Sequence, residues 1–285
     1  MDERRRALFR TLRAGTVGAA RLDGAAQHGR LAGTAFVGGL LTAALDPSEM
    51  SDLTIALYGL APSHPGIGSL RAWELDWYAS SLPAAPATVL VTAAGTGREV
   101  AGLRRLGYSV DAFEPAAGQA GRIESATGSI VVPASYDDFV RASLGGESNA
   151  ATPLASRRYD AVILGWGSFT HVLEPDSQQA VIAACDRLCP EGPLLVSFWA
   201  ATQESRRGRA FVAGRRLGEC LARLRGTAGP EGDPKQTDAL GFAFNVGFTR
   251  RFSRADIESL AGGVGRRLTM LALEPYGHAT LATSG

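Results

Sequence analysis

From residue 87 onward, short apolar runs alternate with segments of helical periodicity, and this alternation constrains the fold more than any other feature of the chain. The apolar runs occupy residues 88–92, 109–114, 129–132, 160–164 and 193–199. Helical spacing lies between them, for example over 97–106 and 177–188. Strands that alternate with helices pair in parallel, and helices cover both faces of the resulting sheet. The sequence therefore predicts an α/β fold.

Two further apolar runs, 268–273 and 276–282, close the chain and are joined by a turn at Glu274-Pro275. A connection this short joins antiparallel strands. We therefore expect a Rossmann-like, seven-stranded, mostly parallel sheet with an antiparallel last strand. Ahead of this pair, residues 204–225 have helical periodicity, 226–241 form a polar loop, and Ser253-Arg254-Ala255-Asp256 resembles a capping box that opens a helix.

The first 84 residues follow a different pattern. Helical spacing covers 4–21 and 25–45, Pro47 stops the second run, and shorter helices are expected from Ser48 and over 70–80. The apolar stretch 31–45 is shorter than the roughly 18 residues that span a bilayer, so we expect a buried helix there. We predict an N-terminal helical extension or lid over 1–84 and a ligand-binding domain over 85–285. Within that domain, 200–252 is expected to be an insert on the acceptor side.

The composition is that of a globular protein, with 45% hydrophobic and 20% charged residues. A formal net charge of +1 provides no field that attracts nucleic acid or a membrane surface, so we expect neither as a partner. No apolar segment of signal-peptide type follows the charged N-terminus, which favours a cytoplasmic protein. The sequence does not indicate an oligomeric state.

The spacing of cysteine and histidine residues predicts no metal site. Cys185 and Cys189 lie four apart on a predicted helix, where we interpret them as packing residues. The remaining cysteine makes the total odd, which does not suggest a disulfide framework. No metal-ligand spacing relates His28, His64 and His278.

Three segments carry the candidate chemistry. The first is the turn Ala93-Ala94-Gly95-Thr96-Gly97, which follows a strand and opens a helix. Small residues there let the backbone pass close to a ligand, and the N–H groups at the helix start face that ligand. The second is Glu114 at the end of the next strand, a position from which a carboxylate accepts hydrogen bonds from both hydroxyls of a ribose. The third is the loop Gly165-Trp166-Gly167 after a buried strand.

In this order and spacing, the three segments resemble class I S-adenosylmethionine-dependent methyltransferases. The resemblance covers about residues 85–285 and implies S-adenosyl-L-methionine as the cofactor. It implies that Glu114, with Pro115 beside it, binds the ribose, and that Ser135 and Tyr136 flank the adenine, on which Tyr136 could stack. The loop 165–167 would line the cofactor and acceptor pocket.

Two residues depart from the pattern of this family. Ala93 stands where the family has the first glycine of its turn, and Val91 stands where it has an acid. Alanine is a mild replacement if its φ is negative. The acid usually helps to order the loop and the methionine end of the cofactor, so its loss indicates weaker binding or a different way of ordering the loop.

Purely structural interpretations of the same residues stay open. Any βα turn can use glycine, Glu114 could be a solvated strand-end acid, and Trp166 could be a packing residue. His171 is the one histidine in a predicted site loop and is a weak candidate for catalysis or for orienting the acceptor, although it could simply cap the following segment. Residues Trp73, Glu74 and Trp77 are expected to pack a helix, with a roof over the cofactor as the alternative.

Methyl transfer to a small-molecule acceptor is the function that this resemblance implies. Because the cofactor supplies the reactive methyl, the protein mainly positions two reactants, and a base is needed only if the acceptor loses a proton early. A non-catalytic protein that binds S-adenosylmethionine or a nucleotide is one alternative. An NAD(P)-dependent oxidoreductase is another, although Val100 interrupts the glycine pattern and the chain has no Tyr-x-x-x-Lys pair.

Overall fold

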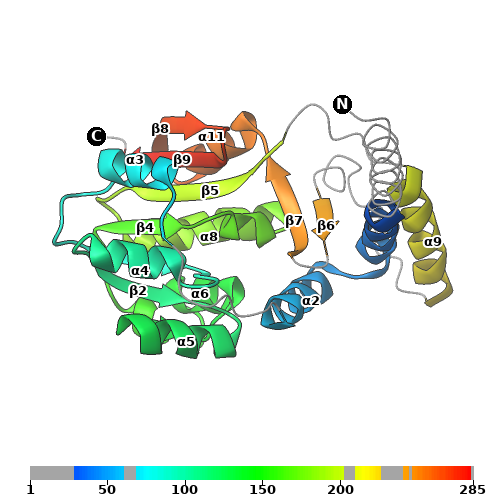
Figure 1. Ribbon diagram of the computed structural model, residues 1–285, viewed down its shortest axis with the longest axis horizontal. Coiled ribbons are helices and arrows are strands. Elements are labelled where there is room, and N and C mark those ends of the chain that lie inside the picture. Colours follow the sequence, from blue (N-terminus) through cyan, green and yellow to red (C-terminus); the bar gives the residue numbers. More distant parts are fainter. Residues whose placement is uncertain (1–28, 61–68, 202–208, 226–239, 244–245, 284–285) are drawn as a thin grey trace, which may run out of the picture. The chain divides into compact units, whose positions relative to one another are not determined.

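A computed structural model describes residues 29–60, 69–201, 209–225, 240–243 and 246–283 (Figure 1). The helix expected over 4–21 and most of the loops expected over 61–69 and 226–241 lie outside these residues. The chain divides into two compact units, one formed by 1–45 with 206–231 and the other by 46–205 with 232–285.

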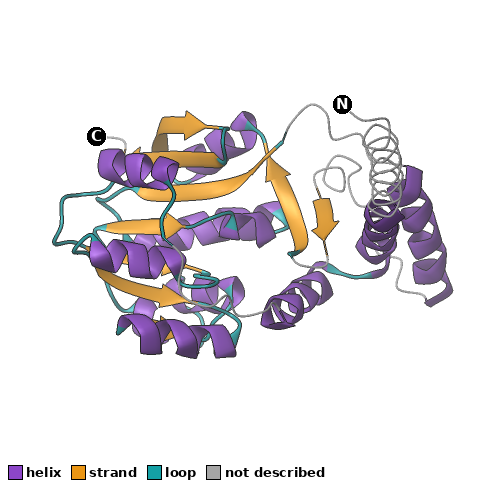
Figure 2. Ribbon diagram, viewed as in Figure 1, coloured by secondary structure: helices purple, strands orange, loops and turns teal. Residues whose placement is uncertain are grey.

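The larger unit is built on a sheet whose five parallel strands follow the order β3-β2-β1-β4-β5. These strands are β1 Thr88–Thr92, β2 Ser109–Phe113, β3 Ile130–Val132, β4 Ala161–Leu164 and β5 Leu194–Ala200. Next to β5 lies β9 (Gly277–Thr283), antiparallel to it, and β8 (Arg266–Ala272) pairs with β9. These strands form the expected mostly parallel sheet with an antiparallel last strand, drawn in Figure 2, and the described sheet has nine strands in all.

A hairpin extends this sheet beyond the sequence-based expectation. It consists of β6 (Leu240–Ala243) and β7 (Gly247–Phe252), which pair antiparallel. The end of β7 runs parallel to the last residues of β5, with Trp199 opposite Arg251. The insert expected over 200–252 thus ends in strands that join the sheet at the end of β5.

Helices cover both faces of the sheet, as Figure 1 shows for α4 and α8. One face carries α3 (Ala72–Ser81), α4 (Arg98–Arg105) and α5 (Ala117–Thr127), whose apolar residues share one cluster with the strands. The other carries α6 (Tyr136–Ser143), α7 (Thr152–Ala155), α8 (Pro175–Leu188) and α11 (Arg254–Gly263). Ser253 and Asp256 form the capping box expected at the start of α11.

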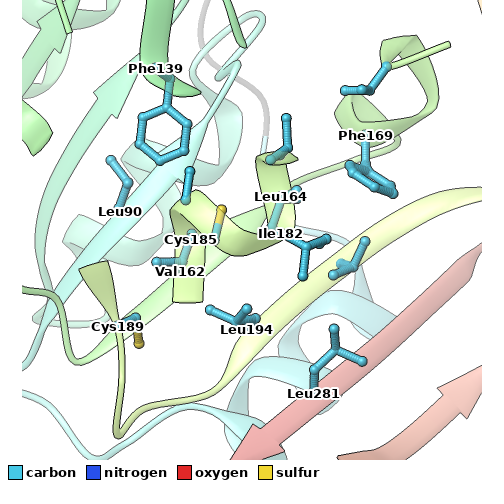
Figure 3. Close-up of a cluster of buried hydrophobic side chains, with 14 of the residues drawn as sticks. Leu90, Phe139, Val162, Leu164, Phe169, Ile182, Cys185, Cys189, Leu194 and Leu281 are labelled. Carbon is cyan, nitrogen blue, oxygen red and sulfur yellow. The ribbon is translucent and has the colours of Figure 1, made fainter. Parts of the chain in front are cut away.

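Strand residues alternate between these two cores. Val89 and Val91 lie in the cluster with α3, α4 and α5, whereas Leu90 between them lies in the other cluster. This period of two is what a strand buried on both faces requires. Cys185 and Cys189 are free thiols buried in the second cluster, which confirms them as packing residues (Figure 3).

The two compact units do not follow the boundary expected at residue 84. Both α2 (Pro47–Leu60) and α3 belong to the larger unit, because Trp77 and Tyr78 of α3 are buried in the sheet's core and α2 contacts β7. A helical pattern in the sequence shows that a segment is amphipathic, but not which surface it covers.

In the smaller unit, a helix over residues 29–44 packs closely against α9 (Arg209–Arg225). Glycines permit this approach: a Cβ on Gly39 would overlap the backbone of Phe211, and a Cβ on Gly214 would overlap that of Phe36. The helix expected over 31–45 is present but only partly buried: Leu31 is 63% exposed, whereas Gly38, Gly39 and Thr42 are buried. The side of this helix that packs is made of small residues.

Candidate functional site

A pocket of about 470 Å³ lies at the carboxyl ends of β1, β2 and β4. This is the edge at which open α/β sheets bind ligands. Its wall contains almost all the residues predicted from the sequence: Ala93, Ala94, Gly95, Thr96, Glu114, Pro115, Ser135, Tyr136, Gly165, Trp166, Gly167 and His171. Gly97 does not line the pocket. It is the N-cap of α4, with a φ of 78°, and it faces Ile123. The structure therefore brings the three sequence segments together.

The turn after β1 has a left-handed backbone at alternate residues. Gly95 has a φ of 58°, and a Cβ added to it would meet no atom within 4 Å, so its Cα borders open space. Ala93 has a φ of 44° and is the only residue other than glycine with a positive φ in the described part of the chain. Alanine is therefore not the mild replacement that a negative φ would make it, because its Cβ crowds the backbone in this region.

Glu114 is buried at 4% exposure, and its carboxylate fastens the turn. Oε2 accepts a hydrogen bond from the N–H of Gly95 at 2.7 Å, and Oε1 accepts one from the N–H of Ala116 at 3.0 Å. Burial raises the pKa of Glu114 to about 7, although these two N–H groups oppose the shift. Each oxygen keeps one lone pair for a ligand. The alternative of a solvated strand-end acid is wrong, because water barely reaches this side chain.

Tyr136 begins α6, where Ser135 caps the helix by accepting from the N–H of Asp138. The Tyr136 hydroxyl lies 2.9 Å from both Thr92 Oγ1 and Ser168 Oγ, so it joins the end of β1 to the 3-10 helix Ser168–His171. Its ring stands edge-on to that of Phe113. Burial raises the pKa of Tyr136 far above its ordinary value, so its hydroxyl stays protonated. Its polar end is held inward while the residue lines the pocket.

The loop after β4 is held from two sides. The N–H of Gly167 donates to Ser197 Oγ at 3.1 Å, and the N–H of Trp166 donates to Glu99 Oε1 at 3.1 Å. The guanidinium groups of Arg71 and Arg98 lie 4.4 Å and 4.0 Å from the centre of the Trp166 ring, within the range of cation–π attraction. Trp166 is therefore both a packing residue and part of the pocket wall.

His171 ends the short 3-10 helix Ser168–His171 and meets α2 across the pocket. Its Nδ1 lies 2.8 Å from the carbonyl oxygen of Phe248, and its Nε2 lies 3.2 Å from the hydroxyl of Tyr58. A carbonyl only accepts, so Nδ1 carries the proton and Nε2 accepts from Tyr58. Burial lowers the pKa of His171, which favours the neutral imidazole. Burial, then the charges of Glu114 and Tyr276, raise the pKa of Tyr58 to about 12.

Several lining residues were not predicted from the sequence. Among them are Tyr58, Arg98, Glu99, Trp199 and Tyr276. A 2.5 Å hydrogen bond from Nε1 to Oη joins Trp199 of β5 to Tyr276, just before β9, and no local pattern reveals this contact. Glu99 gave one usable signal, since it lies four residues before Leu103 and so shares the buried side of the helix with it.

The residues Trp73, Glu74 and Trp77 pack α3 and do not line the pocket, as the packing interpretation expected. Trp73 stacks on Tyr276 with centroids 6.0 Å apart, and Trp77 is buried. Glu74 is fully buried and binds both terminal nitrogens of Arg98, at 2.5 and 2.6 Å. This ion pair fixes the guanidinium that lies over Trp166.

The described residues lack two features. Within those residues, histidine, cysteine, aspartate and glutamate form no cluster of three or more that could hold a metal ion. No helix in the described ranges is long and apolar enough to cross a membrane.

The fold is that of the class I methyltransferases: β9 runs antiparallel between β5 and β8, and the glycine-containing turn follows β1. Solved structures of similar fold include the CcbJ methyltransferase from Streptomyces caelestis, 17% identical, with 85% of this chain and 100% of that one covered and a TM-score of 0.55. Another is DesVI of Streptomyces venezuelae, at 14% identity, 84% and 99% coverage and a TM-score of 0.51.

A third, from Rhodobacter sphaeroides, is named for zinc-dependent alcohol dehydrogenases, at 12% identity, 82% and 98% coverage and a TM-score of 0.53. At these identities the likeness extends to the fold and not to the activity. No protein-family model matches the chain, and no curated protein matches it.

Proposed function

We propose that the protein binds S-adenosyl-L-methionine in this pocket and transfers its methyl group to a small-molecule acceptor. The observation that carries the proposal is the convergence of three separate segments, the turn 93–97, Glu114 and the loop 165–167, on one pocket. A volume of about 470 Å³ lies within the range of small-molecule sites.

The residues present fit the nucleoside half of this cofactor. Glu114 offers lone pairs at the depth of the pocket where a ribose would lie beside the turn, and Gly95 leaves open space above its Cα. Tyr136 presents a ring whose hydroxyl is already fastened, which suits stacking on a base. S-adenosylmethionine supplies an electrophilic methyl on a sulfonium, so the chain's residues need only align the acceptor and exclude water.

The acceptor would lie against α2, which lines the pocket through Pro47, Ser48, Ser51, Thr54, Ile55 and Tyr58. Thr54 is fixed there because its Oγ1 accepts from the N–H of Phe248 at 3.0 Å. Val246, beside β7, completes this side. We therefore keep as a proposal that residues 1–82 and 200–252 select the acceptor; α2 and Val246 support it. The lid role of the remaining N-terminal residues also stays a prediction.

His171 is the candidate base. Because Nδ1–H donates to a carbonyl, Nε2 is the basic nitrogen, and it accepts a hydrogen bond from the Tyr58 hydroxyl. A proton that leaves an acceptor O–H or N–H can pass to Tyr58 Oη while the Tyr58 proton moves to Nε2. The carbonyl of Phe248 then stabilises the imidazolium through Nδ1–H.

Calorimetric titration separates this proposal from its alternatives. We expect S-adenosylmethionine and S-adenosylhomocysteine to bind and NADH and NADPH not to bind. Binding of NADH or NADPH alone would favour an oxidoreductase. Binding of S-adenosylmethionine without methyl transfer to any member of a broad acceptor library would favour a non-catalytic protein.

A further inference from the structure

Glu99 is a buried carboxylate at the pocket that the proposed chemistry leaves unused. It is 5% exposed and lines the pocket from the first turn of α4. Oε1 accepts two hydrogen bonds, from the Tyr78 hydroxyl at 2.7 Å and from the N–H of Trp166 at 3.1 Å. For Oε2, the described residues provide no hydrogen-bond donor. Oε2 is not one of the fully buried polar atoms that lack a partner, and it keeps lone pairs that a ligand in the pocket can use.

The backbone around Glu99 leaves space for this carboxylate. A Cβ on Gly165 would overlap both carboxylate oxygens, so only glycine at 165 allows the group to lie against the loop after β4. Gly165 lines the pocket together with the turn Ala93 to Thr96. Glu99 therefore lies in the pocket wall beside both the turn after β1 and the loop after β4.

The charged groups around Glu99 do not neutralise its carboxylate. Arg98 is the nearest positive group, but both of its terminal nitrogens are engaged by Glu74. Burial raises the pKa of Glu99, the charge of Glu74 raises it further, and the hydrogen bond from Tyr78, the charge of Arg98 and the N–H of Trp166 lower it. The balance is a raised pKa, so a cationic donor at Oε2 would favour the ionised carboxylate.

Val91 of β1 stands at the position where the resemblance leads us to expect an acid. It is fully buried in the apolar core beneath the turn, so β1 offers no acid to the ligand. We propose that Glu99 binds the α-ammonium group of the cofactor's amino-acid part through Oε2, and so supplies from α4 the acid that β1 lacks. The inference rests on the proposed function. It names the residue on which recognition of the amino-acid part depends.

Four ligands test it by calorimetry: S-adenosylhomocysteine, its deaminated analogue 5′-S-(3-carboxypropyl)-5′-thioadenosine, 5′-methylthioadenosine and S-adenosylmethionine. In the Glu99→Gln variant, the amide oxygen can keep both Oε1 contacts, and an NH2 group replaces Oε2. We expect a loss of affinity of about tenfold to a hundredfold for S-adenosylhomocysteine, the scale of a hydrogen bond between charged groups. The deaminated analogue and 5′-methylthioadenosine should bind this variant as they bind the parent protein.

The exposed residue Glu124 on α5 supplies the matched control, and Glu124→Gln should change no affinity. Equal losses for S-adenosylhomocysteine and its deaminated analogue would overturn the inference. So would a much larger loss for S-adenosylmethionine than for S-adenosylhomocysteine, because Glu99 would then face the sulfonium. If none of the four ligands binds the unmodified protein, the proposed function itself fails; if they bind without these differences, only the role of Glu99 fails.

A second measurement needs no variant. If the ammonium ionises Glu99, S-adenosylhomocysteine should release more protons on binding than its deaminated analogue does, at a pH where Glu99 is protonated in the free protein. Titrations in two buffers of different ionisation enthalpy measure this difference directly. Equal proton release by the two ligands throughout the pH range over which Glu99 titrates in the free protein would contradict the inference.

Discussion

The carboxylate of Glu114 accepts a hydrogen bond from the N–H of Gly95 at 2.7 Å, and this bond ties the end of β2 to the turn after β1. The sequence alone suggested that this N–H faces a ligand. Instead, the acid expected to hold the ribose also holds the turn in its left-handed conformation. Substitution of Glu114 therefore affects the ligand and the turn together.

Glu114→Ala should weaken S-adenosylhomocysteine by about 1.5–3 kcal/mol, the scale of hydrogen bonds to a charged group. Two causes add: the ribose loses its acceptor, and the N–H groups of Gly95 and Ala116 lose theirs. Calorimetric titration measures the loss, and circular dichroism confirms that the variant is folded. Unchanged affinity in a folded variant would move the ribose contact to another residue.

The affinity for adenosine ligands should rise with pH until Glu114 is ionised. Its pKa is about 7 in the unliganded protein, so at pH 6 most molecules carry a protonated carboxyl that has lost one acceptor. Ribose hydroxyls favour the ionised form, so affinity increases by up to about tenfold per pH unit below the pKa and levels off above it. The suitable ligand is 5′-methylthioadenosine, because it lacks the ammonium group assigned to Glu99. Glu114→Gln should bind it with the same affinity at pH 5.5 and pH 8.

Ala93→Gly should stabilise the protein by about 0.5–1 kcal/mol. Glycine removes the crowding that alanine suffers at a φ of 44°, and this gain exceeds the added entropy of the unfolded chain. The neighbouring Ala94 has no positive φ, so Ala94→Gly should have the opposite sign and cost about 0.5–1 kcal/mol. Urea unfolding of both variants gives the two values. A loss of stability in Ala93→Gly would show that the turn does not hold this backbone conformation.

Local patterns made most of this fold predictable. The run 88–92 is β1 to the residue, and Ser253 caps α11 as its spacing with Asp256 indicated. What failed depends on contacts between distant segments. The positive φ of Ala93 could not be inferred because sequence gives residue types and not dihedral angles, and the hairpin β6–β7 depends on pairing with the end of β5.

In the candidate site too, residues with a local sequence signal were predicted, and residues that depend on distant contacts were missed. Residues 93–96, Glu114 and 165–167 were found because each follows a strand directly, and the carboxyl ends of parallel strands meet at one edge. Tyr58 was missed because α2 was assigned to a separate extension, and nothing in its sequence shows that it meets His171. Glu99 was missed because its burial depends on a glycine 66 residues later, at position 165.

The pair of Tyr58 and His171 yields a prediction that can be tested before any acceptor is known. Because Nδ1–H donates to the carbonyl of Phe248, ¹⁵N NMR of labelled imidazole should show His171 as the Nδ1–H tautomer, with Nε2 unprotonated, from pH 7 upward. Burial lowers its pKa, so protonation should begin only below the ordinary value near 6.5. Tyr58→Phe removes the hydrogen bond to Nε2 and should move the Nε2 resonance while leaving that of Nδ1 nearly unchanged.

Kinetics with an acceptor found by screening then decide whether the pair serves as a base. His171→Asn should lower kcat by about a hundredfold or more, the usual contribution of a positioned base, without changing the affinity for S-adenosylhomocysteine. Tyr58→Phe should lower kcat as well if the proton passes through the hydroxyl. In the unmodified enzyme, kcat should fall as His171 becomes protonated at low pH, and this limb should be absent from His171→Asn. An unchanged pH profile in that variant would assign His171 to holding α2 and β7 together and not to catalysis.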